Sequence, residues 1–172
     1  MLNFKLIKWG IFMSFLQFFG IQKSLGAELK IGDPAPVVSG VRETGEKVNL
    51  SDFTQKGKVL VYFYPKADTP GCTAQACSLR DSYAALLEKG ITIFGVSTDN
   101  VETQKKFKEK YRLPFALVAD TDKKWTEGFG VPTTFGFTAR QAFLVDGGKI
   151  VWLDRSASTK EQAADVLKFV GK

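Results

Sequence analysis

Residues 59–64 read VLVYFY and are followed by PKADTPGCTAQAC over residues 65–77. The first run is β-branched and aromatic without polar alternation, which is typical of a strand covered on both faces. We therefore expect Val59–Tyr64 to lie in the centre of a sheet. The second run holds both cysteines of the chain, Cys72 and Cys77, directly after this strand.

A helix is expected to begin at Pro70. Proline suits the first helical position, because the N–H that it lacks would be unpaired there in any case. Thr69 then becomes the N-cap and Cys72 the third helical residue. The positive end of the helix dipole and the free N–H groups favour a thiolate, so Cys72 has the surroundings of a reactive cysteine.

The remaining pattern predicts alternating strands and helices, with β-α-β units that make parallel strands. A Gly-containing turn between Val41 and Val48 predicts a small hairpin, and Asp146-Gly147-Gly148 predicts an antiparallel one. The sheet is therefore expected to be mixed. The other expected elements are a helix over 72–89, a strand over 91–96, a helix capped by Asn100 and closed by Pro114, strands over 115–119, 142–145 and 149–152, and a last helix whose Thr159-x-x-Gln162 spacing fits a capping box.

Composition narrows the chemistry. The 172 residues suit one domain, and 44% hydrophobic with 24% charged residues excludes a disordered chain. The absence of histidine excludes Ser-His-Asp and Cys-His catalysis and every His-ligated metal site. Two cysteines are too few for a Cys-only zinc site or an iron–sulfur cluster. The net charge of +6 without a dense basic cluster argues against nucleic-acid binding.

The N-terminus predicts export. Trp9–Ile21 is uncharged and, at 13 residues, too short to span a bilayer but long enough for the core of a signal peptide. We expect residues 1–27 to be a signal peptide and 28–172 to be the mature domain, located in the bacterial periplasm. Leu25 is not the small residue preferred before cleavage at Ala27, so an uncleaved membrane anchor stays open. An N-terminal core helix is a further alternative.

The string YFYPKADTPGCTAQACSLRD, residues 62–81, resembles the active-site segment of the peroxiredoxins, specifically the bacterioferritin comigratory protein or peroxiredoxin Q subgroup. Pro65, Thr69 and Cys72 form the specific Pro-x-x-x-Thr-x-x-Cys pattern. The similarity runs from about residue 32 to the C-terminus and includes the segments 95–99, 113–115 and 140–143. It implies an α/β, thioredoxin-like fold, with a mixed central sheet flanked by helices and an N-terminal β-hairpin.

The resemblance also implies a site. Cys72 would be the peroxidatic cysteine and Cys77 the resolving cysteine, with Pro65, Thr69 and Arg140 around them. The implied enzyme is a thiol peroxidase of the atypical 2-Cys type, acting on hydrogen peroxide and organic hydroperoxides without metal or cofactor. A thioredoxin-like or other dithiol protein would reduce its intramolecular disulfide, and we expect a monomer or weak dimer.

Two departures from the family pattern stand out. Gln75 occupies a position where many members have Glu, and this is expected to remove one partner of Arg140. Pro132-Thr133-Thr134 replaces a longer, more variable stretch. Neither departure touches the Pro-x-x-x-Thr-x-x-Cys pattern.

Other interpretations remain open at this point. An exported thioredoxin-like thiol-disulfide oxidoreductase would use Cys-x-x-Cys, which is absent, and a proline where this chain has Gln141. A noncatalytic binding module would use the two cysteines as a structural disulfide. In those interpretations Thr69 is a simple N-cap and Arg140 forms a surface ion pair.

Overall fold

The structure is a computed structural model, and it describes residues 28–171. The expected signal segment, residues 1–27, lies outside the described residues. Within this part of the chain, no helix combines the length and the apolar character that crossing a membrane requires.

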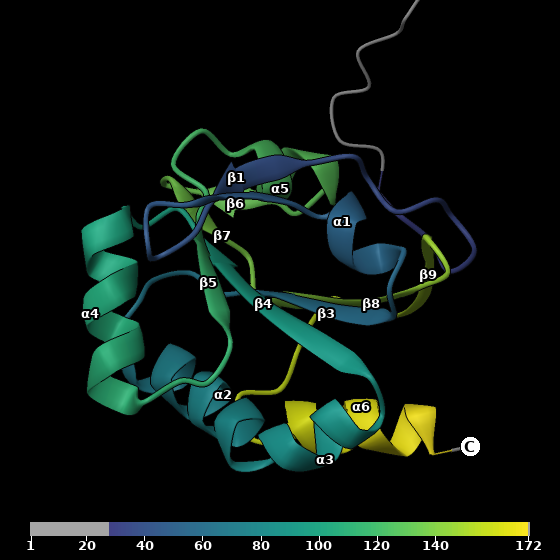
Figure 1. Ribbon diagram of the computed structural model, residues 1–172. Coiled ribbons are helices and arrows are strands. Elements are labelled where there is room, and N and C mark those ends of the chain that lie inside the picture. Colours follow the sequence, from purple (N-terminus) through teal and green to yellow (C-terminus); the bar gives the residue numbers. More distant parts are fainter. Residues whose placement is uncertain (1–27, 172) are drawn as a thin grey trace, which may run out of the picture.

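A five-stranded mixed sheet runs through the middle of the molecule (Figure 1). Its strand order is β5-β4-β3-β8-β9, so the VLVYFY strand is central as predicted. β3 pairs in parallel with β4, which pairs in parallel with β5, whereas β8 is antiparallel to both β3 and β9. The bounds are β3 (Lys58–Phe63), β4 (Ile91–Ser97), β5 (Ala116–Ala119), β8 (Gln141–Asp146) and β9 (Lys149–Asp154).

Strand β3 supplies side chains to two separate cores. Because successive side chains point to opposite faces, Leu60, Tyr62 and Tyr64 lie in one hydrophobic cluster and Val59, Val61 and Phe63 in the other. All six are fully buried. This explains why the run shows no polar alternation: neither face of the strand meets water.

Helices cover both faces. On the lower face in Figure 1 lie α2 (Pro70–Asp81), α3 (Tyr83–Glu88) and α6 (Gln162–Val170), and α4 (Val101–Tyr111) lies beside β5. The upper face carries α1 (Ser51–Thr54), α5 (Lys124–Gly128) and the predicted hairpin of β1 (Ser39–Val41) and β2 (Lys47–Asn49). The predicted cap of α4 is confirmed, since the Asn100 side chain accepts a hydrogen bond from the Thr103 N–H at 2.9 Å.

The prediction of one continuous helix over residues 72–89 is wrong, because the segment forms two helices. Ser82, at φ −100° and ψ 8°, leaves helical geometry and separates α2 from α3. Serine is a weak helix former, so a break costs little at this position. After it, α3 buries Leu86 in the lower core.

The predicted capping box is also wrong. Thr159 lies two residues before the N-cap, which is Glu161, and Gln162 is already the first residue of α6. The Ser158 hydroxyl accepts hydrogen bonds from the Lys160 and Glu161 N–H groups at 3.2 and 3.0 Å. Gln162 therefore does not cap the helix, and its side chain is buried, with 1% exposure.

Three short elements were not predicted: α1, α5 and the hairpin of β6 (Thr133–Thr134) with β7 (Phe137–Thr138). Each is too short to show a hydrophobic period. Strand β6 follows Pro132 and holds the other two residues of the Pro132-Thr133-Thr134 departure, and Phe135, in the turn between the two strands, is 96% exposed.

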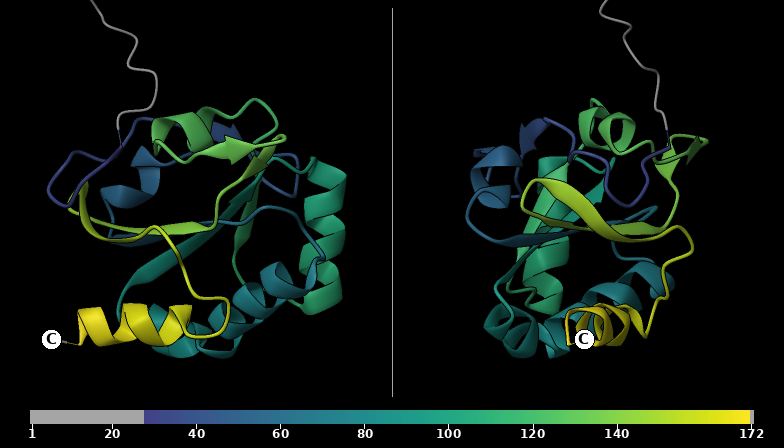
Figure 2. Two further views of the ribbon diagram at one scale, coloured as in Figure 1. Left: turned by 180° about the vertical axis from the view of Figure 1, so that it is seen from behind. Right: turned by 90° about the vertical axis from the view of Figure 1, so that its right-hand side faces the viewer.

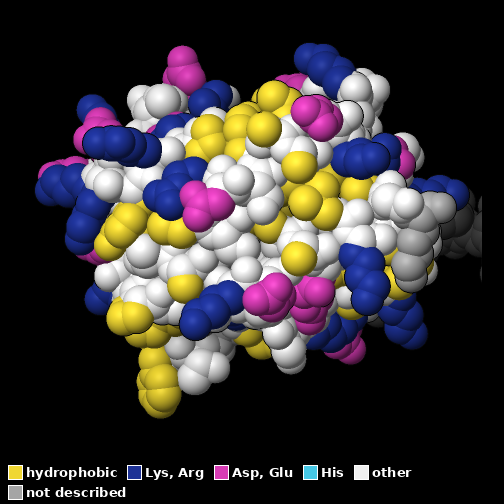
Figure 3. All heavy atoms as spheres, turned by 90° about the horizontal axis from the view of Figure 1, so that it is seen from below, with side chains coloured by type: hydrophobic (Ala, Val, Ile, Leu, Met, Phe, Trp, Pro, Cys, Tyr) yellow, Lys and Arg dark blue, Asp and Glu magenta, His cyan; other side chains and the backbone are white. Residues whose placement is uncertain are grey.

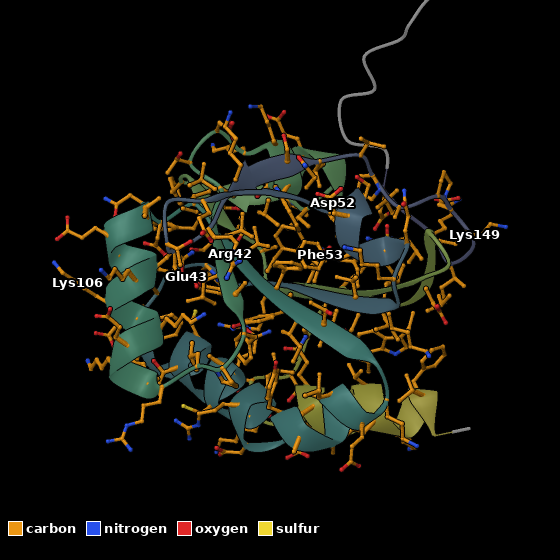
Figure 4. The ribbon with its side chains drawn as sticks, in the orientation of Figure 1. Arg42, Glu43, Asp52, Phe53, Lys106 and Lys149 are labelled. Carbon is orange, nitrogen blue, oxygen red and sulfur yellow. The ribbon has the colours of Figure 1, made fainter. Side chains whose placement is uncertain are left out.

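The β1–β2 hairpin is held against α4 by a buried carboxylate. Glu43 is 3% exposed and accepts hydrogen bonds from Lys108 Nζ at 2.7 Å and from the Leu117 N–H at 2.8 Å. In Figure 4, Arg42 and Glu43 lie together between α4 and the sheet. This contact ties the first hairpin to the edge strand β5.

Replacing Glu43 by Ala should therefore destabilise the fold. The variant removes one of the two acceptors of Lys108 Nζ, which also donates to the Phe115 carbonyl, and it leaves the buried Leu117 N–H unpaired. This should lower the free energy of unfolding by about 2–3 kcal/mol. Glu46→Ala, on the same hairpin but 71% exposed, should change it by less than about 0.5 kcal/mol. Urea denaturation of both variants checks this, and equal effects would contradict it.

Candidate active site

Cys72 lies in the first turn of α2, where the sequence predicted it. Helix α2 begins at Pro70, and Thr69 is the N-cap with extended backbone at φ −94° and ψ 154°. The sulfur-bearing residue is 1% exposed. The Thr69 hydroxyl donates to the Lys66 carbonyl at 3.0 Å, so the side chain braces the preceding loop and does not cap the helix.

Arg140 reaches the sulfur from the other side of the site. Its Nη2 donates to Cys72 Sγ at 3.3 Å, and its Nη1 donates to Gln75 Oε1. The expectation that Gln75 removes a partner of Arg140 is therefore wrong, because an amide oxygen accepts this hydrogen bond as a carboxylate does. Arg140 precedes β8 directly, so the sheet positions the guanidinium.

Gly71 gives Arg140 room to approach. A Cβ at this residue would lie 3.2 Å from Arg140 Nη2. That is closer than most side chains pack, so a Cβ at this position would require the guanidinium to shift by a few tenths of an ångström.

Cys77 lies on the same helix, five residues after Cys72. Both cysteines are free thiols; Cys72 is buried and Cys77 is half-buried. Helix α2 is intact between them.

A hydrogen-bond network fixes the loop that begins at Pro65. Asp99 accepts from the Ala67 N–H and from the Ser97 hydroxyl, both at 2.7 Å. The Thr138 hydroxyl donates to the Tyr64 carbonyl at 2.8 Å. Pro65 itself is half-buried. The loop is thus fastened to the end of β4 and to β7.

A second contact fastens the loop to α4. Asp68, at a positive φ of 59°, accepts from Lys110 Nζ at 2.9 and 2.7 Å and from the Tyr111 hydroxyl at 2.5 Å. The hydrogen bonds from Lys110 and then Tyr111 hold the pKa of Asp68 below its ordinary value. The strained backbone at Asp68 is thereby held in place from outside the loop.

Two tyrosines lie beneath the site. Burial raises the pKa values of Tyr62 and Tyr64 well above the ordinary value for tyrosine, so both remain neutral phenols. The Tyr64 hydroxyl donates to Gln104, whose amide donates to Ser97 Oγ at 2.8 Å and to the Val118 carbonyl at 3.1 Å. This buried support was not predicted; its signal in the sequence is the polar Ser97 at the end of an apolar strand.

Comparison with known proteins identifies the family. Residues 31–153 match the model of the AhpC/TSA family. Peroxiredoxin Bcp of Escherichia coli strain K12 is 48% identical over 130 residues, which cover 71% of this chain and 83% of that protein. The chain belongs to the peroxiredoxins.

Solved structures agree with this membership. Peroxidoxin BcpB of Mycobacterium tuberculosis superposes with a TM-score of 0.79 at 31% identity, covering 84% of this chain and 97% of that one. The bacterioferritin comigratory protein of Xanthomonas campestris, for which alkyl peroxide reduction activity is described, gives a TM-score of 0.74 at 25% identity, covering 83% of this chain and 96% of that one. This peroxiredoxin accordingly has the thioredoxin-like fold that the sequence predicted.

A substitution at Gly71 should affect the stability of this peroxiredoxin and the reactivity of Cys72 in opposite directions. Gly71→Ala should stabilise the protein by about 0.5 kcal/mol, because alanine favours a helix over glycine. The same Cβ should displace Arg140 and slow the reaction of Cys72 with peroxide about tenfold, since an oriented charged donor is lost. Thermal unfolding and stopped-flow oxidation measure the two effects, and a variant with the normal rate would show that Arg140 tolerates the methyl group.

Proposed function

We propose that the Cys72 thiolate attacks the terminal oxygen of a peroxide. The O–O bond breaks, one oxygen stays on the sulfur as sulfenic acid, and the other leaves, with a proton, as water or an alcohol. The single observation that carries this proposal is the 3.3 Å hydrogen bond from Arg140 Nη2 to Cys72 Sγ at a helix start. That guanidinium favours the thiolate and is placed to stabilise charge that develops along the O–O bond.

Thr69 and Pro65 complete the proposed peroxide site. Thr69 is the N-cap, adjacent in space to the free N–H groups of the first turn. Its hydroxyl oxygen, with the Cys72 N–H, would hold the peroxide, and Pro65 would close the loop beside it.

Cys77 is the proposed resolving cysteine. Its thiol condenses with the sulfenic acid, releasing water and forming a Cys72–Cys77 disulfide, and a thioredoxin-like dithiol protein then reduces that disulfide.

The proposed substrates include organic hydroperoxides, which the alkyl peroxide activity named for the Xanthomonas relative supports. The face formed by α2, α3 and α6 mixes charged and hydrophobic side chains, as Figure 3 shows, which suits a transient protein partner.

Export remains part of the proposal. The 13 uncharged residues of Trp9–Ile21 support secretion to the periplasm, with or without cleavage after Ala27. Cell fractionation followed by mass spectrometry of the N-terminus tests both statements, and recovery of an intact N-terminus from the cytoplasm would contradict export.

Two cysteine variants test the chemistry. Cys72→Ser should abolish peroxide consumption, because no other thiol of the chain occupies a helix start. Cys77→Ser should still form one sulfenic acid per chain, but excess peroxide should drive it to sulfinic acid and end its turnover with a dithiol reductant. Peroxide loss and intact mass measure these outcomes. Normal consumption by Cys72→Ser, or normal cycling by Cys77→Ser, would overturn the corresponding role.

The disulfide requires α2 to unwind. Five residues along an intact helix place two Cα atoms roughly 8.6 Å apart, from the rise per residue and the helix radius. A disulfide accepts Cα separations up to about 6.8 Å. The first turns of α2 must therefore open before Cys72 and Cys77 can join.

Hydrogen exchange measures this opening. In the oxidised form, amides 73–79 should lose protection relative to the reduced form, because their helical hydrogen bonds are broken. The strand β3 should remain protected in both forms and serves as the internal control. Equal protection of 73–79 in both forms, with the Cys72–Cys77 bridge confirmed by mass spectrometry, would refute unwinding.

A further inference from the structure

A chain of side-chain hydrogen bonds connects α6 to the sulfur of Cys72. Gln162 Oε1 accepts from Gln75 Nε2 at 2.6 Å. Gln75 Oε1 accepts from Arg140 Nη1, and Arg140 Nη2 donates to Cys72 Sγ. Gln75 is fully buried and Gln162 is 1% exposed, so water does not compete for these partners.

The direction of this chain is fixed by arginine. A guanidinium has donors only, so Gln75 must turn its carbonyl oxygen toward Arg140. Its NH₂ group then faces the other way and needs an acceptor, which Gln162 Oε1 supplies. Arg140 thus orients the Gln75 amide, and the Gln75 NH₂ group in turn faces the Gln162 oxygen.

Helix α6 is positioned to hold this acceptor. Both views of Figure 2 show α6 beside α2, and Gln162 is the first residue of α6. The same residue leaves its own Nε2 without a hydrogen-bond partner. Burying an unpaired N–H group destabilises the fold. The hydrogen bond that Gln162 makes is therefore the one accepted by its oxygen, from Gln75.

We propose that Gln162 is a positioning residue for peroxide reduction, acting through Gln75 to orient Arg140 on the Cys72 sulfur. This inference rests on the peroxidase chemistry proposed above. Without an acceptor at residue 162, the buried NH₂ group of Gln75 is left unpaired, so the Gln75 side chain is driven to shift toward another acceptor. That shift loosens the hydrogen bond from Arg140 Nη1 to Gln75 Oε1 and frees the guanidinium to move off the sulfur.

The competing explanation is that Gln162 simply fastens α6 to α2. The chain offers a matched control for this, because the Ser78 hydroxyl also fastens α2 to the segment that leads into α6, donating to the Lys160 carbonyl at 2.8 Å. Within residues 28–171, the Ser78 hydroxyl forms no hydrogen bond with Gln75 or Arg140. Ser78→Ala therefore loosens the same interface without changing the chain to Cys72.

The experiment compares Gln162→Met, Gln162→Glu and Ser78→Ala in the full-length protein. Met keeps the volume and removes the acceptor, whereas Glu keeps an acceptor oxygen in either protonation state. Two quantities are measured in single turnover: the rate constant of Cys72 with hydrogen peroxide, and the pH profile of Cys72 alkylation by iodoacetamide. Cys77→Ser serves as the common background so that Cys72 alone reacts at the site.

Gln162→Met should slow peroxide reduction about tenfold, the scale set by leaving a buried donor unpaired, and should shift the alkylation profile to higher pH. Gln162→Glu should stay within about threefold of the parent, and Ser78→Ala within about twofold. Equal behaviour of Gln162→Met and Ser78→Ala in both measurements would reduce Gln162 to a packing contact and overturn the proposal.

A second pair of variants tests the route through Gln75. In a Gln75→Glu background the carboxylate pairs with Arg140 by charge and needs no acceptor behind it, so Gln162→Met should then change the rate by less than about twofold. An undiminished tenfold effect would show that Gln162 does not act through Gln75. Failure of the parent to react with peroxide would refute the proposed function instead, while the alkylation profiles, which need no peroxide, still decide the role of Gln162.

Discussion

Antiparallel pairing places Phe63 of β3 opposite Gln141 of β8, and parallel pairing places the same Phe63 opposite Val96 of β4. Three segments therefore meet at one end of the central strand: the loop that leads to Cys72, the residue Arg140 that precedes β8, and the polar end of β4 with Asp99. A shift of one residue in either register would turn every side chain of β3 to the other face. Such an exchange would put the larger set, Leu60, Tyr62 and Tyr64, into the core that is packed around Val59, Val61 and Phe63. The mismatch in both cores specifies the register, and with it the approach of Arg140 to the sulfur.

The elements that could be predicted from the sequence are those whose structure is decided by a few neighbouring residues. The unbroken apolar run fixes the central strand, and Pro70 fixes the start of α2 and hence the place of Cys72. The Asp146-Gly147-Gly148 turn likewise joins the antiparallel strands β8 and β9. In each case the pattern lies within a few consecutive residues, and the tertiary contacts agree with the local structure that it predicts.

Misses arose where distant contacts decided the outcome. Thr159-x-x-Gln162 fits a capping box, yet Gln162 pairs with Gln75, which lies 87 residues away in the sequence. Likewise, Asp99 holds the Ala67 N–H across 32 residues. Gln75 was expected to remove one partner of Arg140, but its amide oxygen accepts a hydrogen bond from the guanidinium. No local pattern carries such information, because a polar residue that turns inward looks in sequence like one that faces water.

The break at Ser82 has a consequence for the lifetime of the enzyme. Of the residues that α2 buries, Cys72, Gln75, Ala76 and Leu79, only Leu79 is a large hydrophobic side chain. Opening α2 therefore withdraws only one large hydrophobic side chain of the helix from the core, while α3, beyond the break, keeps Leu86 buried as a separate cooperative unit. A protein that opens this helix in every proposed catalytic cycle thus limits the number of its own hydrophobic side chains that neighbouring molecules can bind before the helix closes again.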